Sequence, residues 1–494
     1  MSSANASALV APDPFRLPSH VRPTRYDVLL RPTLDDASFS GEVSIKLDVS
    51  EPTTSIVLNA VELWIDEVRV EGINATWSLD ESTERMTVEL DEAVAESTTL
   101  FVRFRGTLND KLRGFYRSTY IDASGIAHVI ATSQMQATDC RRAFPCWDEP
   151  AFKAVFGITL DVADGLSAIS NGSELGRTSD DGRTLIRFAD TMTMSSYLVA
   201  VVVGELEMTD PLDVDGTPLR IVHVPGKSGL TQFGLEVGAF CLRWFQEYYD
   251  IEYPSDKVDL VGLPDFAAGA MENLGCITFR ESLLLIDPDR STQHERQLVA
   301  DVVAHELAHM WFGDLVTMNW WNGIWLNEAF ATFMEIAACD AFAPEWERWT
   351  SFGLERSVAF EVDSLASTRS VEFEVRSPAE ADGMFDVLTY QKGGALLRML
   401  EQYLGPAEFR AGVSHYLRTH AYANTETNDL WDAIEATSGE PVRRLMDSWI
   451  WQPGFPLVSA ALIDVDGVPH VQLQQERFSY GESAQTNSWV IPVH

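Results

Sequence analysis

Cysteine and long apolar runs are both scarce in this sequence. Five Cys occur among 494 residues, at positions 140, 146, 241, 276 and 339, and no two form a C-x-x-C pair. The odd number and the spacing indicate neither a disulfide framework nor a zinc ribbon. Apolar runs such as Leu198–Val203 are far shorter than the roughly 20 residues that a membrane-spanning helix requires.

The first residues carry no targeting pattern. Residues 1–7 contain neither the basic region nor the apolar region of a secretory signal peptide. Together with the low cysteine content, this predicts a cytoplasmic protein that does not associate with membranes.

Positive charge is also scarce. The chain has 36 Lys and Arg against 74 Asp and Glu, which gives a formal net charge of −38. Such a surface repels phosphate backbones and anionic lipids, so a nucleic-acid partner is excluded and a membrane partner is disfavoured. A negative field instead attracts cationic ligands. The balance of 46% hydrophobic and 22% charged residues is typical of a soluble globular protein.

The first two hundred residues predict strands. Short runs with alternating apolar residues are separated by turn residues, as at Val43–Val49, Met86–Leu90 and Leu100–Arg105. A period of two with β-branched residues is typical of strands that are buried on one face. We expect this all-β region to close with a buried strand at Tyr197–Val203.

Helices dominate the following region. Apolar residues at helical spacing predict helices at about 230–249, 325–342 and 390–404. A further helix is predicted from Thr292, where Thr292 and Glu295 have the form of a capping box, to about Phe312 before Gly313. Strands are predicted at 258–261 and 276–280, and again after Leu457 with a turn at 464–467.

The sequence His305-Glu306-Leu307-Ala308-His309 is the central chemical signal. On a helix, side chains four residues apart lie on one face, so the two imidazoles can converge on one zinc ion. Glu306 lies beside them, where its carboxylate can reach a water on the ion. The alternative is a helix that carries two unrelated surface histidines.

A catalytic zinc needs a third protein ligand. One zinc-peptidase pattern would place Gly at 312 and His at 315, but Phe312 and Leu315 stand there and exclude it. Glu328 follows His309 after 18 residues, which is enough for a turn and an antiparallel helix. Glu335 lies two helical turns further on the same face, where it can hydrogen-bond a ligating imidazole; the alternative is a solvated helix carboxylate.

A second pattern is Gly269-Ala270-Met271-Glu272-Asn273, between two predicted strands. Gly269 permits close approach of another backbone, and a carboxylate at the rim of a metal cleft can bind a cation. Taken alone, the pentapeptide is equally typical of a loop with an acidic residue.

The two patterns together resemble the joint signature of the aminopeptidase N family of zinc metallopeptidases, on its puromycin-sensitive side. Further stretches agree with the resemblance, which covers the chain from about Pro18 onwards: Arg141–Pro150, Trp311–Thr317, Tyr390–Gly394 and Gln452–Pro456. The resemblance implies an α+β chain of several domains. These are an all-β domain at 1–207, a thermolysin-like catalytic domain at 208–456, and the start of a β-sandwich at 457–494. Because few residues follow Pro456, we expect this last domain to be truncated.

The resemblance also implies a role for each matching residue. His305, His309 and Glu328 would bind one zinc ion per chain, and Glu306 would be the general base and proton donor. Glu272 would bind the α-ammonium of a peptide with a free N-terminus. Gly269 and Ala270 would pair with the substrate backbone, Met271 would line the first side-chain pocket, and Asn273 completes the motif. Tyr390 would stabilise the oxyanion; from the residues alone it is equally a buried core tyrosine.

Gln136 is a departure from the family pattern. Most relatives carry Glu at this position, and a few, including leukotriene A4 hydrolase, carry Gln. The substrate amine then has one charged partner fewer. The predicted function is a zinc aminopeptidase. The alternatives are an endopeptidase, an epoxide hydrolase like leukotriene A4 hydrolase, and a non-catalytic peptide-binding member. The sequence leaves the oligomeric state open.

Overall fold

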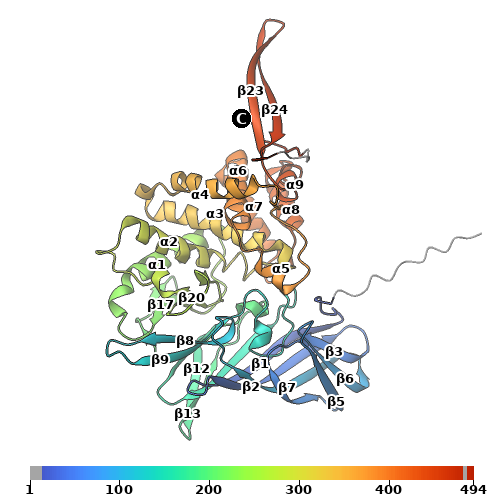
Figure 1. Cartoon of the computed structure of the whole chain (residues 1–494), viewed down its shortest axis with the longest axis vertical. Helices are drawn as coiled ribbons and strands as arrows, with labels where there is room; N and C mark the ends of the chain where they lie inside the picture. Colours follow the sequence, from blue (N-terminus) through green and yellow to red (C-terminus); the bar gives the residue numbers. More distant parts are fainter. Residues whose placement is uncertain (1–13, 482–486, 494) are drawn as a thin grey trace, which may run out of the picture.

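The computed structural model describes residues 14–481 and 487–493. A β-rich region built from the first half of the chain forms one end of the molecule, and a region of sheet and helices lies against it (Figure 1). A two-stranded hairpin projects from the opposite end (Figure 1). The expected α+β fold with an all-β N-terminal region followed by a mixed region is confirmed.

The N-terminal region is built on a seven-stranded sheet in the order β12-β13-β10-β1-β2-β7-β4. The predicted alternation is observed, since every second residue of β2 is buried. A three-stranded sheet, β3-β6-β5, lies beside it. The strands are β1 Val21–Thr33, β2 Ser38–Val49, β3 Thr53–Asn59, β4 Trp64–Val70, β5 Ala75–Asp80, β6 Arg85–Val94, β7 Ser97–Thr107, β10 Val155–Ala163, β12 Glu174–Asp180 and β13 Arg183–Phe188.

A four-stranded sheet, β11-β14-β9-β8, connects this region to the rest of the molecule. Its strands are β8 Gly114–Ile121, β9 Ala127–Gln134, β11 Ser167–Ser170 and β14 Val201–Gly204. The strand predicted at 197–203 is only partly correct. Residues 196–198 form a 3₁₀ turn and the strand begins at Val201, because Ala200 N–H is bonded by the side chain of Asn171 instead of a neighbouring strand.

The next sheet positions the candidate site. Its order is β15-β17-β18-β20-β19, with β16 paired to β17; β17, β18 and β20 are parallel, and β19 is an antiparallel edge strand. The strands predicted near 258 and 276 are therefore confirmed. The bounds are β15 Glu207–Met208, β16 Leu212–Val214, β17 Thr217–His223, β18 Val258–Leu263, β19 Ala270–Met271 and β20 Cys276–Arg280.

Three long helices belong to the same region as this sheet: α1 Gln232–Tyr249, α2 Gln293–Ala308 and α3 Trp325–Phe342. The predicted capping box is present, with Thr292 and Glu295 each bonding the other's backbone N–H. The regular part of α2 ends at Ala308, four residues before the predicted end. After Ala308 the backbone hydrogen bonds join residues three apart, as in a 3₁₀ turn: Met310 N–H donates to Leu307 C=O, and Trp311 N–H donates to Ala308 C=O.

Further helices complete this region. A π-helical turn at Leu388–Lys392 precedes α6, so the helix predicted at 390–404 is confirmed apart from its irregular start. The remaining helices are α4 Arg348–Asp363, α5 Pro378–Asp382, α6 Gly393–Leu404, α7 Pro406–Thr419, α8 Thr427–Ser438 and α9 Val442–Ile450; two further short strands are β21 Thr317–Met318 and β22 Asn424–Thr425. Among the described residues, no helix combines the length and the apolarity that crossing a bilayer demands.

The projecting hairpin consists of β23 Pro456–Val465 and β24 Val468–Arg477 (Figure 1). The predicted turn is confirmed: Asp466 and Gly467 have φ of 55° and 81°, as a two-residue hairpin turn requires. The two strands pair only with each other among the described residues. The prediction of strands after Leu457 is wrong for the end of the chain, since residues 487–493 form no strand; His494 lies outside the described residues.

A buried lysine ties the N-terminal region to the sheet that carries the site. Lys257 is 6% exposed, and its Nζ donates to Ser170 C=O at 2.8 Å, Gly275 C=O at 2.6 Å and Asp259 Oδ2 at 2.8 Å. Ser170 belongs to β11 and the other two acceptors to the β18–β20 segment. Because a buried ammonium is costly unless its donors are satisfied, this contact fixes the mutual position of the two regions.

We expect Lys257→Met to lower the free energy of unfolding by about 3–5 kcal/mol, because it removes one partner of a buried ion pair. The same substitution at Lys227, which pairs with Glu281 at 3.2 Å on a more exposed surface, is the matched control. It should change the stability by less than about 1 kcal/mol. Urea denaturation of both variants provides the measurement. Equal losses of unfolding free energy would show that the buried Lys257 contact stabilises the fold no more than the exposed Lys227 pair does.

Candidate active site and metal centre

The three predicted metal ligands meet at the contact between α2 and α3. His305 lies at the end of α2, His309 follows it directly, and Glu328 lies in the first turn of α3. Glu328 Oε2 is 3.3 Å from Nε2 of both His305 and His309. All three residues are 9% exposed or less.

This arrangement fits a zinc ion. Two ligand atoms that lie 2.0–2.1 Å from a tetrahedral ion are about 3.3–3.4 Å apart, the spacing found here. The two nitrogens and the carboxylate oxygen are also the donor types that catalytic zinc sites use, with a fourth position left for water or substrate. The residues present therefore match the group that the resemblance implies.

The other ring nitrogen of each histidine is held by the protein. Glu335 Oε2 lies 2.6 Å from His305 Nδ1, two turns along α3 from Glu328. His309 Nδ1 lies 2.8 Å from the carbonyl oxygen of Phe312. Since both acceptors favour a proton on Nδ1, both Nε2 atoms are left free to bind a metal. No sequence pattern predicts the contact with the Phe312 carbonyl, because every residue has a backbone carbonyl.

Charges around the site shift the pKa of its groups strongly. Burial opposes protonation of His309, but the carboxylates of Glu272 and Glu328 outweigh it and raise its pKa to about 9. Burial also opposes ionisation of Glu328, yet the two imidazoles lower its pKa to about 2. Burial raises the pKa of Glu306 to about 8, against the opposing effect of the imidazoles. Burial thus disfavours the ionised form of Glu306, whereas the charge of Glu328 is stabilised by the two imidazoles.

Glu272 lies beside the metal ligands, directly after β19. Its side chain is buried, and burial raises its pKa, although His309 acts in the opposite direction. Gln136, from the segment after β9, donates from Nε2 to Glu272 Oε1 at 3.1 Å. Two segments more than a hundred residues apart thus combine into one polar group that faces the site.

β19 offers a free backbone edge next to Glu272. Arg280 N–H donates to Gly269 C=O at 2.9 Å, and Ala270 faces Phe279 in the ladder. In an antiparallel pair, hydrogen-bonded and non-hydrogen-bonded positions alternate, so the N–H and C=O of Ala270 point away from β20. Ala270 also lines the cavity described below.

The remaining residues of the Gly269–Asn273 motif lie behind this edge. Gly269 already has its carbonyl engaged by Arg280. Met271 is fully buried and its sulfur accepts from Gln134 Nε2 at 3.4 Å. Asn273 is 1% exposed and its Nδ2 donates to Thr278 Oγ1 at 3.1 Å. Gly269, Met271 and Asn273 are therefore not among the described residues that line the cavity.

Tyr390 reaches the site from the π-helical turn before α6. Its ring stacks on the imidazole of His305, with centroids 5.8 Å apart and planes inclined by 19°. Burial raises the pKa of Tyr390, and the neighbouring carboxylate of Glu328 adds to the effect. The phenol therefore keeps its proton and can act as a donor.

These groups line a cavity of about 420 Å³. Residues that the sequence did not single out also line it, from the β8 edge, the segment after β9 and the α5 region: Lys111, Leu112, Arg113, Gln134, Ala137, Asp139, Asp382 and Phe385. No local sequence pattern indicates a role for these residues, because they lie far in the chain from the two patterns that identified the site. A larger cavity of about 560 Å³ lies elsewhere, near Trp320 and Glu372, but its lining includes no histidine.

Comparison with known proteins gives a consistent result. Residues 22–198 match the peptidase M1 N-terminal domain, and residues 233–449 match the peptidase family M1 domain. The chain is 42% identical over 488 residues to aminopeptidase M1 of Arabidopsis thaliana, covering 97% of this chain and 55% of the relative. It is 39% identical over 490 residues to the puromycin-sensitive aminopeptidase of Caenorhabditis elegans, covering 97% of this chain and 52% of the relative.

A third relative is the alanine/arginine aminopeptidase of Saccharomyces cerevisiae, at 40% identity over 453 residues, covering 90% of this chain and 53% of the relative. The chain thus spans about half the length of the curated relatives it matches.

The pKa values predict how zinc binding depends on pH. Metal binding needs neutral imidazoles, but His309 holds its proton up to a pKa of about 9 in the metal-stripped protein. We therefore expect the apparent zinc affinity to rise by at least about tenfold per pH unit from pH 7 to 9. A competition titration against a fluorescent chelator measures it. A zinc affinity that does not change over that range would contradict the view that His309 must lose a proton before it binds the metal.

Proposed function

Because the chain belongs to the M1 family of peptidases, we propose that it is a zinc-dependent aminopeptidase that removes the N-terminal residue from peptides. The observation that carries the proposal is the position of Glu272. A buried carboxylate stands beside a set of zinc ligands and opens into the same cavity. Such a group demands a cation, and the free α-ammonium of a peptide supplies one.

His305, His309 and Glu328 would hold one zinc ion at this site. When bound, zinc polarises the scissile carbonyl and lowers the pKa of a water molecule towards about 7. Glu335 and the Phe312 carbonyl keep the two imidazoles in the tautomer and orientation that this binding needs.

Glu306 would move the proton. It follows His305 on α2 and lines the cavity, so its carboxylate can take a proton from the attacking water and return it to the leaving nitrogen. Burial raises its pKa to about 8 in the metal-free protein. Positive charge in the filled site would lower this pKa again, so the carboxylate would be ionised at neutral pH and able to accept a proton.

The other cavity residues would orient the substrate. Glu272 binds the ammonium, and Gln136 fixes the Glu272 carboxylate through the 3.1 Å contact. The free edge of Ala270 pairs with the peptide backbone in the manner of an added strand. Tyr390 donates a hydrogen bond from its phenol to the oxyanion that forms on the carbonyl, where such a donor stabilises more than in the ground state.

Replacing Glu306 by Gln tests the base assignment. We expect kcat to fall by roughly 10²–10⁴-fold, the usual contribution of positioned acid–base catalysis, while the zinc content is unchanged. Stopped assays with aminoacyl amides, combined with metal analysis, provide the measurement. Loss of zinc would make Glu306 a ligand, and retention of more than about half of the activity would exclude it as the base.

Replacing Glu272 by Ala tests the exopeptidase assignment. We expect kcat/KM for peptides with free N-termini to fall by roughly 10- to 150-fold, because a charge-assisted contact of about 1.5–3 kcal/mol is lost. Glu408→Ala, an exposed carboxylate on α7, is the control and should leave kcat/KM unchanged.

N-acetylated peptides of the same sequence separate the alternatives. The wild-type enzyme should cleave them poorly, and Glu272→Ala should affect them little, since they carry no ammonium. Efficient cleavage of acetylated peptides by the wild type would indicate an endopeptidase instead.

A further inference from the structure

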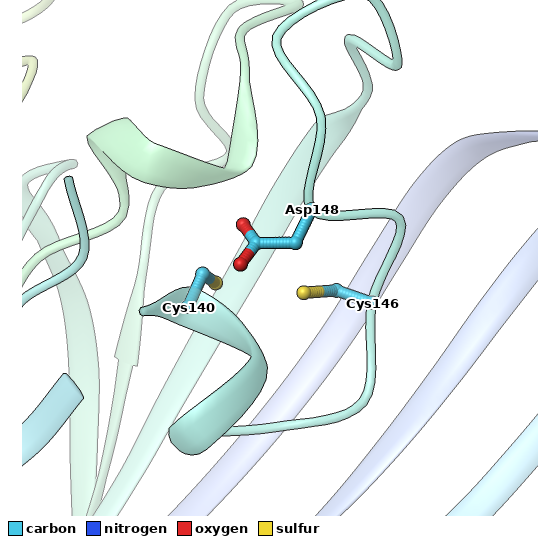
Figure 2. Close-up of side chains that lie close together, drawn as sticks. All are labelled: Cys140, Cys146 and Asp148. Atoms are coloured by element: carbon cyan, nitrogen blue, oxygen red, sulfur yellow. The ribbon is translucent and has the colours of Figure 1, made fainter. Parts of the chain in front are cut away.

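A second group of potential metal ligands lies outside the cavity. Cys140, Cys146 and Asp148 come from one segment of the N-terminal region and turn their side chains towards a common point (Figure 2). The two sulfurs and a carboxylate oxygen all lie within 4.8 Å of one another. All three residues are buried, at 0%, 0% and 1% exposure. We call them the Cys–Cys–Asp cluster.

The backbone of the cluster is anchored on both sides. Cys146 exchanges two hydrogen bonds with Asn59 of β3, at 2.8 and 3.0 Å. Asp148 N–H donates to Asn59 Oδ1 at 3.2 Å, and Cys140 begins the 3₁₀ turn Cys140–Arg142. The three donors are therefore held in place by the fold and not by a flexible loop.

The Asp148 carboxylate is oriented as ligating carboxylates are. Oδ1 accepts from Ser196 Oγ at 2.7 Å, and Oδ2 accepts from Arg141 Nε at 2.9 Å and from its backbone N–H at 3.2 Å. Outer partners of this kind fix a ligand and tune its basicity. One lone-pair direction of the carboxylate remains available beside the two thiols.

A divalent ion would offset the charge of two thiolates. Arg141 already pairs with the carboxylates of Asp148 and Glu84, both at 2.9 Å, so its charge is not available to the thiolates. A dication bound by two thiolates adds no net charge to the buried cluster. Without a metal, burial raises the pKa of both thiols, which keeps them protonated.

From this geometry we propose that the Cys–Cys–Asp cluster is a second, structural metal site for a thiophilic divalent cation such as Zn²⁺ or Cd²⁺. Two sulfur donors select such ions over Mg²⁺ and Ca²⁺. Ligand atoms around tetrahedral zinc stand about 3.5–3.8 Å apart, so side-chain shifts of about 1 Å close the site. Because the cluster is buried, the ion enters as the segment folds.

The site would fix the segment that reaches the active cavity. Gln136 and Asp139, which line that cavity, lie immediately before Cys140 in the chain. An ion on the cluster holds the far end of this segment to β3. It takes no part in the proposed peptide hydrolysis and does not depend on it.

Counting zinc in the purified 494-residue chain tests the proposal. Protein from zinc-supplemented cells, dialysed against metal-free buffer, should contain two zinc ions per chain by plasma mass spectrometry. Glu328→Ala should contain one and Glu328→Ala combined with Cys140→Ala none. Cys241→Ala, which removes a buried thiol of α1 outside the cluster, is the matched control and should keep two.

A second measurement keeps the test independent of how Cys140→Ala folds. Cobalt-loaded wild-type protein should show a thiolate-to-cobalt charge-transfer band, and Ser196→Ala, which retains both thiols, should weaken cluster affinity by roughly 10- to 100-fold. One zinc per chain in the wild type would overturn the proposal. A Cys140–Cys146 disulfide in the native protein would also overturn it, as would zinc and cobalt signals that are unchanged when Cys140 is replaced.

Discussion

Four buried carboxyl groups around two imidazoles are the constraint on which the site depends. Glu272, Glu306, Asp314 and Glu328 are each 5% exposed or less, and their charges act on one another. Burial acts to raise the pKa of all four carboxyl groups, and only at Glu328 do the two imidazoles outweigh it and lower the pKa. The proposed zinc ion and substrate ammonium would each bring positive charge to these buried carboxyl groups and favour their ionised form.

Packing between the two regions positions this acidic group. The Nζ of Lys153 donates to the carbonyls of Asp314 and Leu315, at 3.2 and 3.1 Å. The phenol of Tyr197 donates to the carbonyl of Gly313 at 3.1 Å. Both donors come from the N-terminal region, and all three acceptors lie in the turn that follows His309. The N-terminal region thus supports the loop between α2 and α3 as well as supplying Gln136 to the cavity.

Much of the fold was predictable because its signals are local. Alternation in β2, the Thr292 capping box and the Asp466–Gly467 turn each depend on residues close in sequence. Predictions were wrong where tertiary contacts compete with local preference. Residues 197–200 are apolar and were predicted to form a strand, yet the side chain of Asn171 takes the backbone bond that a strand would make. The end of α2 tightens around the metal ligands instead of continuing to Phe312.

The sequence alone determined the ligand spacing, because His305 and His309 lie one turn apart on a single helix and Glu328 and Glu335 lie on the next. It also determined the motif that carries Glu272. Only the tertiary structure decided that Gln136 contacts Glu272, that Ala270 presents the free edge, and that the Phe312 carbonyl holds His309. It likewise brought Cys140 and Cys146 together with Asp148, although they form no recognised motif. These contacts join segments through turns and sheet edges, whose geometry is set by packing and not by local residue spacing.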